Sequence, residues 1–115
     1  MLTIELPFPP AILSGHANGN DRWKKVKATA EFRELGKIAV TDAGGFALPA
    51  KGDIPMHIHF IPPDRRGDRW NYVNRMKGAI DGIAEGLGVN DRRFLPSISY
   101  AEPEKPGRVI VTIGG

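Results

Sequence analysis

Three side chains in the middle of the sequence have the types and spacing that metal-assisted phosphodiester chemistry requires. Asp68 precedes and Asp91 follows a segment with helical periodicity, and Lys77 lies within that segment. Phosphodiester hydrolysis needs an activated water and a stabilised phosphate, and Mg²⁺ held by a few carboxylate oxygens can supply both. A nearby lysine can stabilise the phosphate or the leaving oxygen. We therefore take Asp68 and Asp91 as candidate metal ligands and all three residues as candidate catalytic residues.

Each of these residues also has an ordinary structural explanation. Aspartate at position 68 suits a helix start, where the macrodipole favours negative charge. Asp91 suits a turn, and Lys77 lies four residues before Asp81, the spacing of a routine ion pair on a helix surface. Taken singly, the structural explanations are the more common ones, and Asp81 is left out of the catalytic set. The combined pattern is what favours a site.

Basic side chains gather in the same part of the chain and near its N-terminus. The net charge is +3, and most Lys and Arg residues fall within 22–27, 65–77 and 92–93. Such clustering is typical of a surface that follows a phosphate backbone, although solvated helix faces produce the same pattern. The residues expected to contact DNA are Arg65, Arg66, Arg69, Asn71, Arg75, Lys24, Lys25 and Lys27.

Composition excludes several other classes of chemistry. The 115-residue chain has no cysteine, so it has no disulfide, thiolate zinc site or cysteine nucleophile. It has no Gly-Lys-Ser/Thr phosphate loop and no Gly-x-Ser-x-Gly elbow, so neither an NTPase nor a serine hydrolase is indicated. No small-molecule cofactor is expected. His57 and His59 share one face of a predicted strand, but histidines so placed are more often ordinary strand residues than zinc ligands.

No segment of the sequence indicates a membrane partner. No apolar run approaches the ~20 residues that span a bilayer. The N-terminus lacks the basic start and the apolar stretch of a signal peptide. We therefore expect a cytoplasmic protein.

Four strands are predicted from hydrophobic alternation. They cover residues 2–6, 56–61, 97–101 and 108–113. Met56, Ile58 and Phe60 are expected to share the buried face of the second strand. Prolines and a glycine separate the last two strands, which predicts a hairpin with a long loop.

Two helices are predicted between the strands. The first runs from residue 20 or 21 to about 42, after a loop at 13–20, and ends at Gly44 and Gly45. Its apolar stripe is expected to contain Trp23, Val26, Ala30, Leu35, Ile38 and Ala39. The second runs from residue 70 or 71 to 86, with Val73, Met76, Ile80, Ile83, Ala84 and Leu87 at spacings of three and four. Residues 1–115 are thus expected to form one α+β domain, in the order β-α-β-α-β-β, with a mixed sheet and two helices packed on it.

The segment 62–94 resembles the RusA family of Holliday junction resolvases. The residues that carry the resemblance, in order, are Pro63-Asp64-Arg65-Arg66, Asp68-Arg69-Trp70-Asn71, Arg75-Met76-Lys77, Asp81-Gly82-Ile83 and Leu87-Gly88-Val89-Asn90-Asp91, with Leu6-Pro7-Phe8-Pro9-Pro10 resembling the family's opening strand and turn. The resemblance implies a RusA-like fold and a crossover junction endodeoxyribonuclease that uses Mg²⁺, with Mn²⁺ as a possible substitute. Such an enzyme resolves four-way junctions by paired symmetric nicks, in DNA recombination and repair.

The family's functional residues carry over at four positions. Asp68 matches the first aspartate of an Asp-x-Asp-Asn motif, and Asn71 matches its asparagine. Lys77 matches the lysine of the following helix, and Asp91 matches the late aspartate. A continuous helix of ~16 residues would hold its two ends ~24 Å apart. We therefore expect a homodimer in which Asp68 of one chain meets Asp91 of the partner subunit; the alternative is that loops fold back within one chain.

One position departs from the family's pattern. The second motif aspartate falls on Trp70, which cannot bind a metal ion. Asp64 or Asn90 could supply the missing oxygen ligand. Trp70 itself is expected to pack under the helix start, or else to stack on an unpaired junction base. The departure leaves open a branched-DNA-binding protein with impaired catalysis, and the bulk properties leave open a small basic fold with no nucleic-acid role.

Overall fold

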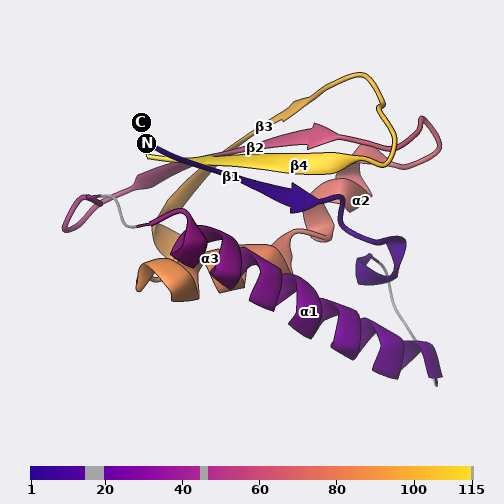
Figure 1. Ribbon diagram of the computed structural model, residues 1–115, viewed down its shortest axis with the longest axis horizontal. Helices are drawn as coiled ribbons and strands as arrows, with labels where there is room; N and C mark the ends of the chain where they lie inside the picture. The colour runs from indigo at the N-terminus through magenta and orange to yellow at the C-terminus, as the bar shows by residue number, and fades with distance from the viewer. Residues whose placement is uncertain (15–19, 45–46, 115) are drawn as a thin grey trace.

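A mixed four-stranded sheet organises the chain, and two helices cover one of its faces (Figure 1). The structure is a computed structural model that describes residues 1–14, 20–44 and 47–114. The strands are β1 (Leu2–Pro7), β2 (Ile54–Ile61), β3 (Phe94–Tyr100) and β4 (Arg108–Ile113). The helices are α1 (Asn20–Asp42), α2 (Arg69–Asn74) and α3 (Lys77–Leu87), with short 3₁₀ helices η1 (Ala11–Leu13) and η2 (Asp91–Arg93). The predicted α+β class, mixed sheet and packed helices are confirmed.

The strand order is β1-β4-β2-β3, so the predicted hairpin between the last two strands is wrong. β4 pairs antiparallel with β1 and β2, whereas β3 pairs in parallel with β2 alone. Val109, Val111 and Ile113 of β4 are fully buried, as suits a central strand. β3 contains Pro96, which has no N–H to donate and therefore suits an edge.

The core lies between the sheet and the two longer helices. Alternate residues of β1, β2 and β4 point into it, and the predicted buried face of Met56, Ile58 and Phe60 is confirmed. From the helix side, Phe32, Val40, Met76 and Ile83 complete the core. Burial of apolar area here is the main source of stability.

The face that α1 buries is not the predicted one. Phe32, Gly36 and Val40 are buried, whereas Trp23, Val26, Leu35 and Ile38 of the expected stripe are exposed. The reason is close packing against α3. A Cβ atom on Gly36 would lie 2.5 Å from the carbonyl oxygen of Ala79, so only a glycine permits this approach. Backbone proximity between the two helices selects the face, and it overrides the more apolar stripe.

The second predicted helix is interrupted. α2 ends at Asn74 and α3 begins at Lys77, because the turn tightens and the Met76 N–H donates to the Val73 carbonyl three residues back. The predicted apolar set is largely confirmed, since Met76 and Ile83 are fully buried. Gly88 ends α3 in the left-handed conformation with φ +71°.

Two smaller expectations have different outcomes. Gly44 follows α1 with φ +81°, as predicted for a left-handed stop. Gly45 and most of the predicted 13–20 loop lie outside the described residues.

Among the described residues, no helix combines the length and apolar character needed to cross a bilayer.

Candidate functional site

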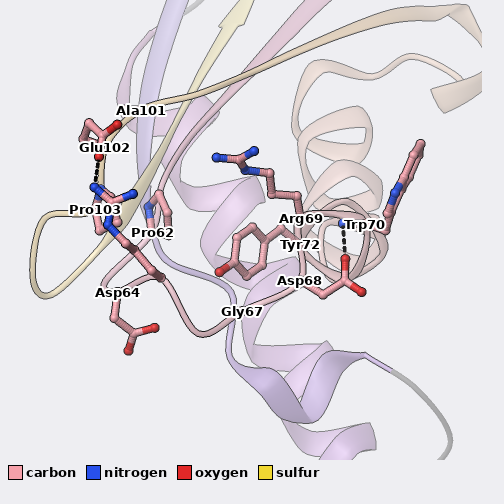
Figure 2. Close-up of a pocket in the computed structure, with 11 residues that line it drawn as sticks. Pro62, Asp64, Gly67, Asp68, Arg69, Trp70, Tyr72, Ala101, Glu102 and Pro103 are labelled. Atoms are coloured by element: carbon pink, nitrogen blue, oxygen red, sulfur yellow. Dashed lines mark hydrogen bonds and ion pairs between the residues drawn. The ribbon is translucent and has the colours of Figure 1, made fainter.

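A cavity of about 460 Å³ lies between the end of β2 and the start of α2 (Figure 2). The loop between these elements forms one wall, and the segment after β3 forms the other. Its polar and aromatic lining includes Asp64, Arg65, Asp68, Arg69, Trp70 and Glu102. The cavity is therefore lined by the predicted metal ligand Asp68 and by two of the predicted DNA contacts, Arg65 and Arg69.

Tyr72 fixes the shape of this cavity. Its ring is buried against Phe8, with ring centroids 4.8 Å apart, and near Phe60, with centroids 6.0 Å apart. The loop crosses over the tyrosine at Gly67, where a Cβ atom would lie 1.9 Å from the Tyr72 hydroxyl oxygen. Glycine at this position therefore lets the loop lie directly on the aromatic cluster.

Asp68 caps α2. Its Oδ1 atom accepts a hydrogen bond of 2.9 Å from the Trp70 backbone N–H, the usual role of an aspartate at a helix start. The ordinary structural explanation for this residue is therefore realised. Asp64, earlier in the loop, accepts from the Arg66 backbone N–H at 2.9 Å, and this bond holds the pKa of the Asp64 carboxyl below its usual value.

Lys77 meets two aspartates on α3 and η2. Its Nζ atom lies 2.5 Å from Asp91 Oδ2 and 3.0 Å from Asp81 Oδ1. The contact exists because the chain reverses after Gly88, so that η2 folds back along α3. We call Lys77, Asp81 and Asp91 the α3 cluster.

Charges within the α3 cluster reinforce one another. The hydrogen bond from Lys77 holds the pKa of Asp91 below its usual value. Asp91, and then Asp81, raise the pKa of Lys77. At neutral pH the lysine therefore stays an ammonium group that can donate to an anionic oxygen, and the aspartate stays a carboxylate.

These pKa shifts predict how stability depends on pH. The lowered pKa of Asp91 stabilises the fold above its unfolded value of ~3.9 and loses this effect as pH falls through the folded pKa. The raised pKa of Lys77 stabilises the fold below ~10.4 and loses this effect as pH rises through the folded pKa. Lys77→Met should therefore lower the urea midpoint at pH 6, and this difference should shrink as the pH falls to 3 and below. A Lys51→Met control should show no such convergence, and an undiminished Lys77→Met effect at pH 3 would argue against the pairing.

The structure does not bring all three predicted catalytic residues together within one chain. Lys77 and Asp91 are in contact, whereas Asp68 makes no hydrogen bond or ion pair with either in the described part of the chain. No group of three or more Asp, Glu or His side chains suited to a metal ion occurs among the described residues. Two carboxylates, Asp81 and Asp91, do converge, and Mg²⁺ is often held by one or two carboxylates with its other positions filled by water and phosphate.

Asp81 is the residue that sequence reasoning placed outside the site. Its spacing from Lys77 correctly indicated an ion pair. The return of η2, which adds Asp91 to the same ammonium group, has no signal in local periodicity. It depends on the left-handed turn at Gly88.

The basic residues expected to contact DNA have different surroundings. Arg65 pairs with Glu102, Arg66 pairs with Asp64, and both arginines are highly exposed. Arg69 lies over the Tyr100 ring at 5.3 Å. Arg65 and Arg66 keep most of their surface open to a partner, and Arg69, the first residue of α2, is also exposed.

Arg75 and the α1 lysines complete that set. The Arg75 guanidinium is half-buried, donates to Ser14 Oγ at 3.3 Å and lies over the Tyr72 ring. These contacts give it a structural role, and its contact with DNA stays a prediction. Lys24 and Lys27 are exposed on α1, whereas Lys25 is half-buried.

Trp70 does not pack under the helix start, so that expectation is wrong. Its side chain is 82% exposed, and it points away from the other labelled side chains that line the cavity (Figure 2). An exposed indole beside Asp68 leaves its face open to a planar ligand.

His57 and His59 are tied into the sheet. The His57 ring nitrogens lie 2.7 Å from Ser97 Oγ and 2.7 Å from Ser99 Oγ, and His59 Nδ1 lies 2.6 Å from the same Ser99 oxygen. The two histidines thus link β2 to β3 on the open face of the sheet, in line with ordinary strand residues.

One comparison with known proteins finds a relative. A protein of Xylella fastidiosa (strain Temecula1 / ATCC 700964), described as an uncharacterized protein, is 36% identical over 120 residues. The alignment covers 100% of this chain and 77% of the relative. This chain belongs to the same family as the Xylella protein. No family model matches the chain. The description of the Xylella protein assigns no activity.

Proposed function

We propose that the protein is a Mg²⁺-dependent endonuclease that resolves four-way junctions and related branched DNA, on a RusA-like scaffold. The observation that carries the proposal is the α3 cluster, in which two carboxylates and one ammonium group converge. A basic loop with a cavity lies just before it in the chain. The ordered resemblance of residues 62–94 to the RusA family supports the same function.

The chain's own residues have distinct roles in this proposal. Asp91 and Asp81 are the within-chain carboxylates that would hold the metal ion. Bound Mg²⁺ supplies an activated water and neutralises phosphate charge. Lys77, kept protonated by its acidic neighbours, donates a hydrogen bond to a phosphate or leaving oxygen. Arg65 and Arg66 bind the backbone phosphates on either side.

A two-fold homodimer suits paired nicks in opposing strands, and we propose that the protein acts as one. The second site of the dimer then cuts the strand related by symmetry. Asp68, which is separate from the α3 cluster in its own chain, remains our proposed contribution to the partner subunit's site. Its second carboxylate oxygen is the atom left for that role, since Oδ1 caps α2.

A second candidate is a branched-DNA-binding protein that does not cut. Two observations favour it. Trp70 stands where the RusA family has an aspartate, and Asp68 already caps a helix. This protein would bind four-way junctions tightly and leave them intact with Mg²⁺ or Mn²⁺.

The variant Trp70→Asp separates the two candidates. If the protein is a nuclease, the wild type nicks a labelled four-way junction with Mg²⁺, and the variant binds it about 5- to 150-fold more weakly because one base–aromatic stack is worth ~1–3 kcal/mol. Trp70→Phe is the matched control and should keep most of the affinity. Gain of cutting in Trp70→Asp over an inactive wild type would instead establish the second candidate.

A further inference from the structure

The first seven described side chains of α1, residues 21–27, project beyond the core. We call this segment the α1 arm. None of its side chains is buried, and the first buried residue among the described side chains of α1 is Phe32. Figure 1 shows the N-terminal part of α1 extending well past the end of the sheet. The arm therefore presents most of its circumference to solvent.

The α1 arm concentrates positive charge. It contains Arg22, Lys24, Lys25 and Lys27 against the single acidic residue Asp21, so its net charge of +3 equals that of the whole chain. Within the described part of the chain, Arg22, Lys24 and Lys27 have no hydrogen-bonding or ionic partner for their side chains. These three cations are thus left for an external anion.

Three cations elsewhere in the protein differ in this respect. On the same helix, Arg33 and Lys37 both bind Glu85 of α3, at 2.9 and 3.1 Å. On the sheet, Arg108 pairs with Glu5 at 3.3 Å. Arg22, Lys24 and Lys27 therefore differ from these three cations, whose charges are each compensated by a carboxylate.

An exposed aromatic side chain lies among these cations. Trp23 is 76% exposed and Val26 is 55% exposed, and together with Arg22 they line a shallow hollow of about 320 Å³. Cations interleaved with an exposed aromatic ring are typical of nucleic-acid surfaces, where a base or sugar packs on the ring.

The charge decides between possible occupants. A second copy of the arm would place like charges face to face, which is repulsive. A helix that lies in a membrane surface needs a broad apolar face. The arm offers only Trp23 and Val26, so a polyanion with little apolar surface fits it better.

We infer that the α1 arm binds the phosphate backbone of a duplex arm of the branched DNA, with Trp23 packed on a sugar or base edge. The inference rests on the proposed function and adds a second contact surface away from the α3 cluster. Seven helical residues extend ~10 Å, and duplex DNA carries one charge per ~1.7 Å of axis. About three phosphates of the facing strand therefore match Arg22, Lys24 and Lys27.

Salt dependence of duplex binding tests this inference. The triple variant Arg22→Ala, Lys24→Ala and Lys27→Ala should bind a linear duplex at least tenfold more weakly at low salt. Its plot of log affinity against log salt should be shallower by about 2–3, since each phosphate contact contributes ~0.9. The matched control removes three cations outside the arm, Lys37, Lys51 and Arg108, and should change the slope less than half as much.

A fluorescence measurement reports on Trp23 directly. The chain has two tryptophans, so Trp70→Phe leaves Trp23 as the single indole fluorophore. Adding linear duplex should quench its emission, and the arm triple variant in this background should lose the quenching. Unchanged Trp23 emission on binding would overturn the packing of Trp23 on DNA.

The remaining outcomes show whether the arm inference fails alone or together with the proposed function. An arm triple variant that keeps the wild-type affinity and salt slope would overturn the arm inference, while junction cutting by the wild type is scored separately. Tighter arm-dependent binding to phosphatidylcholine–phosphatidylserine vesicles than to duplex at equal salt would also overturn it. A wild type that binds no DNA would remove both proposals.

Discussion

Replacing Asp91 with asparagine is expected to lower Mg²⁺-dependent junction cutting by ~10²-fold or more, because the change removes a carboxylate charge where the metal ion and the attacking water are needed. Junction binding should remain within about threefold of the wild type, since the basic loop and the α1 arm are unchanged. The measurement is single-turnover cutting of a labelled four-way junction, with binding measured separately in Ca²⁺.

The matched control for this variant is Asp42→Asn. Asp42 is an exposed aspartate at the end of α1, so its replacement makes the same change of charge away from the α3 cluster. The control should cut at the wild-type rate. Equal cutting by Asp91→Asn and the wild type would remove Asp91 from the mechanism.

Gly82→Ala should cause the largest loss of stability among single methyl additions on α3. A Cβ atom at this position would lie 1.9 Å from the carbonyl oxygen of Arg33, which is backbone and cannot rotate away. Forcing α1 and α3 apart should cost ~1–3 kcal/mol or more, against a helix-propensity gain of ~1 kcal/mol for alanine over glycine. Urea unfolding followed by circular dichroism measures the net loss.

Gly78→Ala is the matched control on the same helix face. A Cβ atom at Gly78 would lie 3.2 Å from the carbonyl oxygen of Thr29, a contact that a small shift relieves. Its free energy of unfolding should stay near the wild-type value. If Gly82→Ala were no less stable than Gly78→Ala, the close contact of the two helices would be wrong as described.

Elements of the fold were predictable where local signals are strong. β2 and α1 follow from alternation and from helix boundaries, and their bounds agree with the structure to within about two residues. The strand order was not predictable from spacing, because short separation between β3 and β4 suggests a hairpin. Pro96 on β3 and the fully buried Val111 on β4 were the available signals for an edge strand and a central strand.

The buried face of α1 shows why apolar pattern alone can mislead. The most apolar stripe includes Trp23 and Ile38, yet both are exposed. The buried face includes Gly36, which periodicity counts as neutral. Close helix packing depends on glycines of the other helix, 40 or more residues away in the sequence, and no local window contains both.

The candidate site was predictable in its residue types and only in part in its arrangement. Lys77 and Asp91 were singled out together, and the structure joins them. Asp81 was missed because its pairing looked routine, and Asp68 was grouped with residues it does not touch within the chain. Turn geometry at Gly88, which sequence patterns describe poorly, determines which acids meet.

Nick mapping on a four-way junction tests the central claim most directly. The wild type is incubated with a junction labelled on each strand in turn, with Mg²⁺ and with EDTA. We predict Mg²⁺-dependent nicks placed symmetrically in two opposing strands, and none with EDTA. A protein that binds the junction but leaves all four strands intact with Mg²⁺ and with Mn²⁺ would contradict the claim that the α3 cluster is a nuclease site.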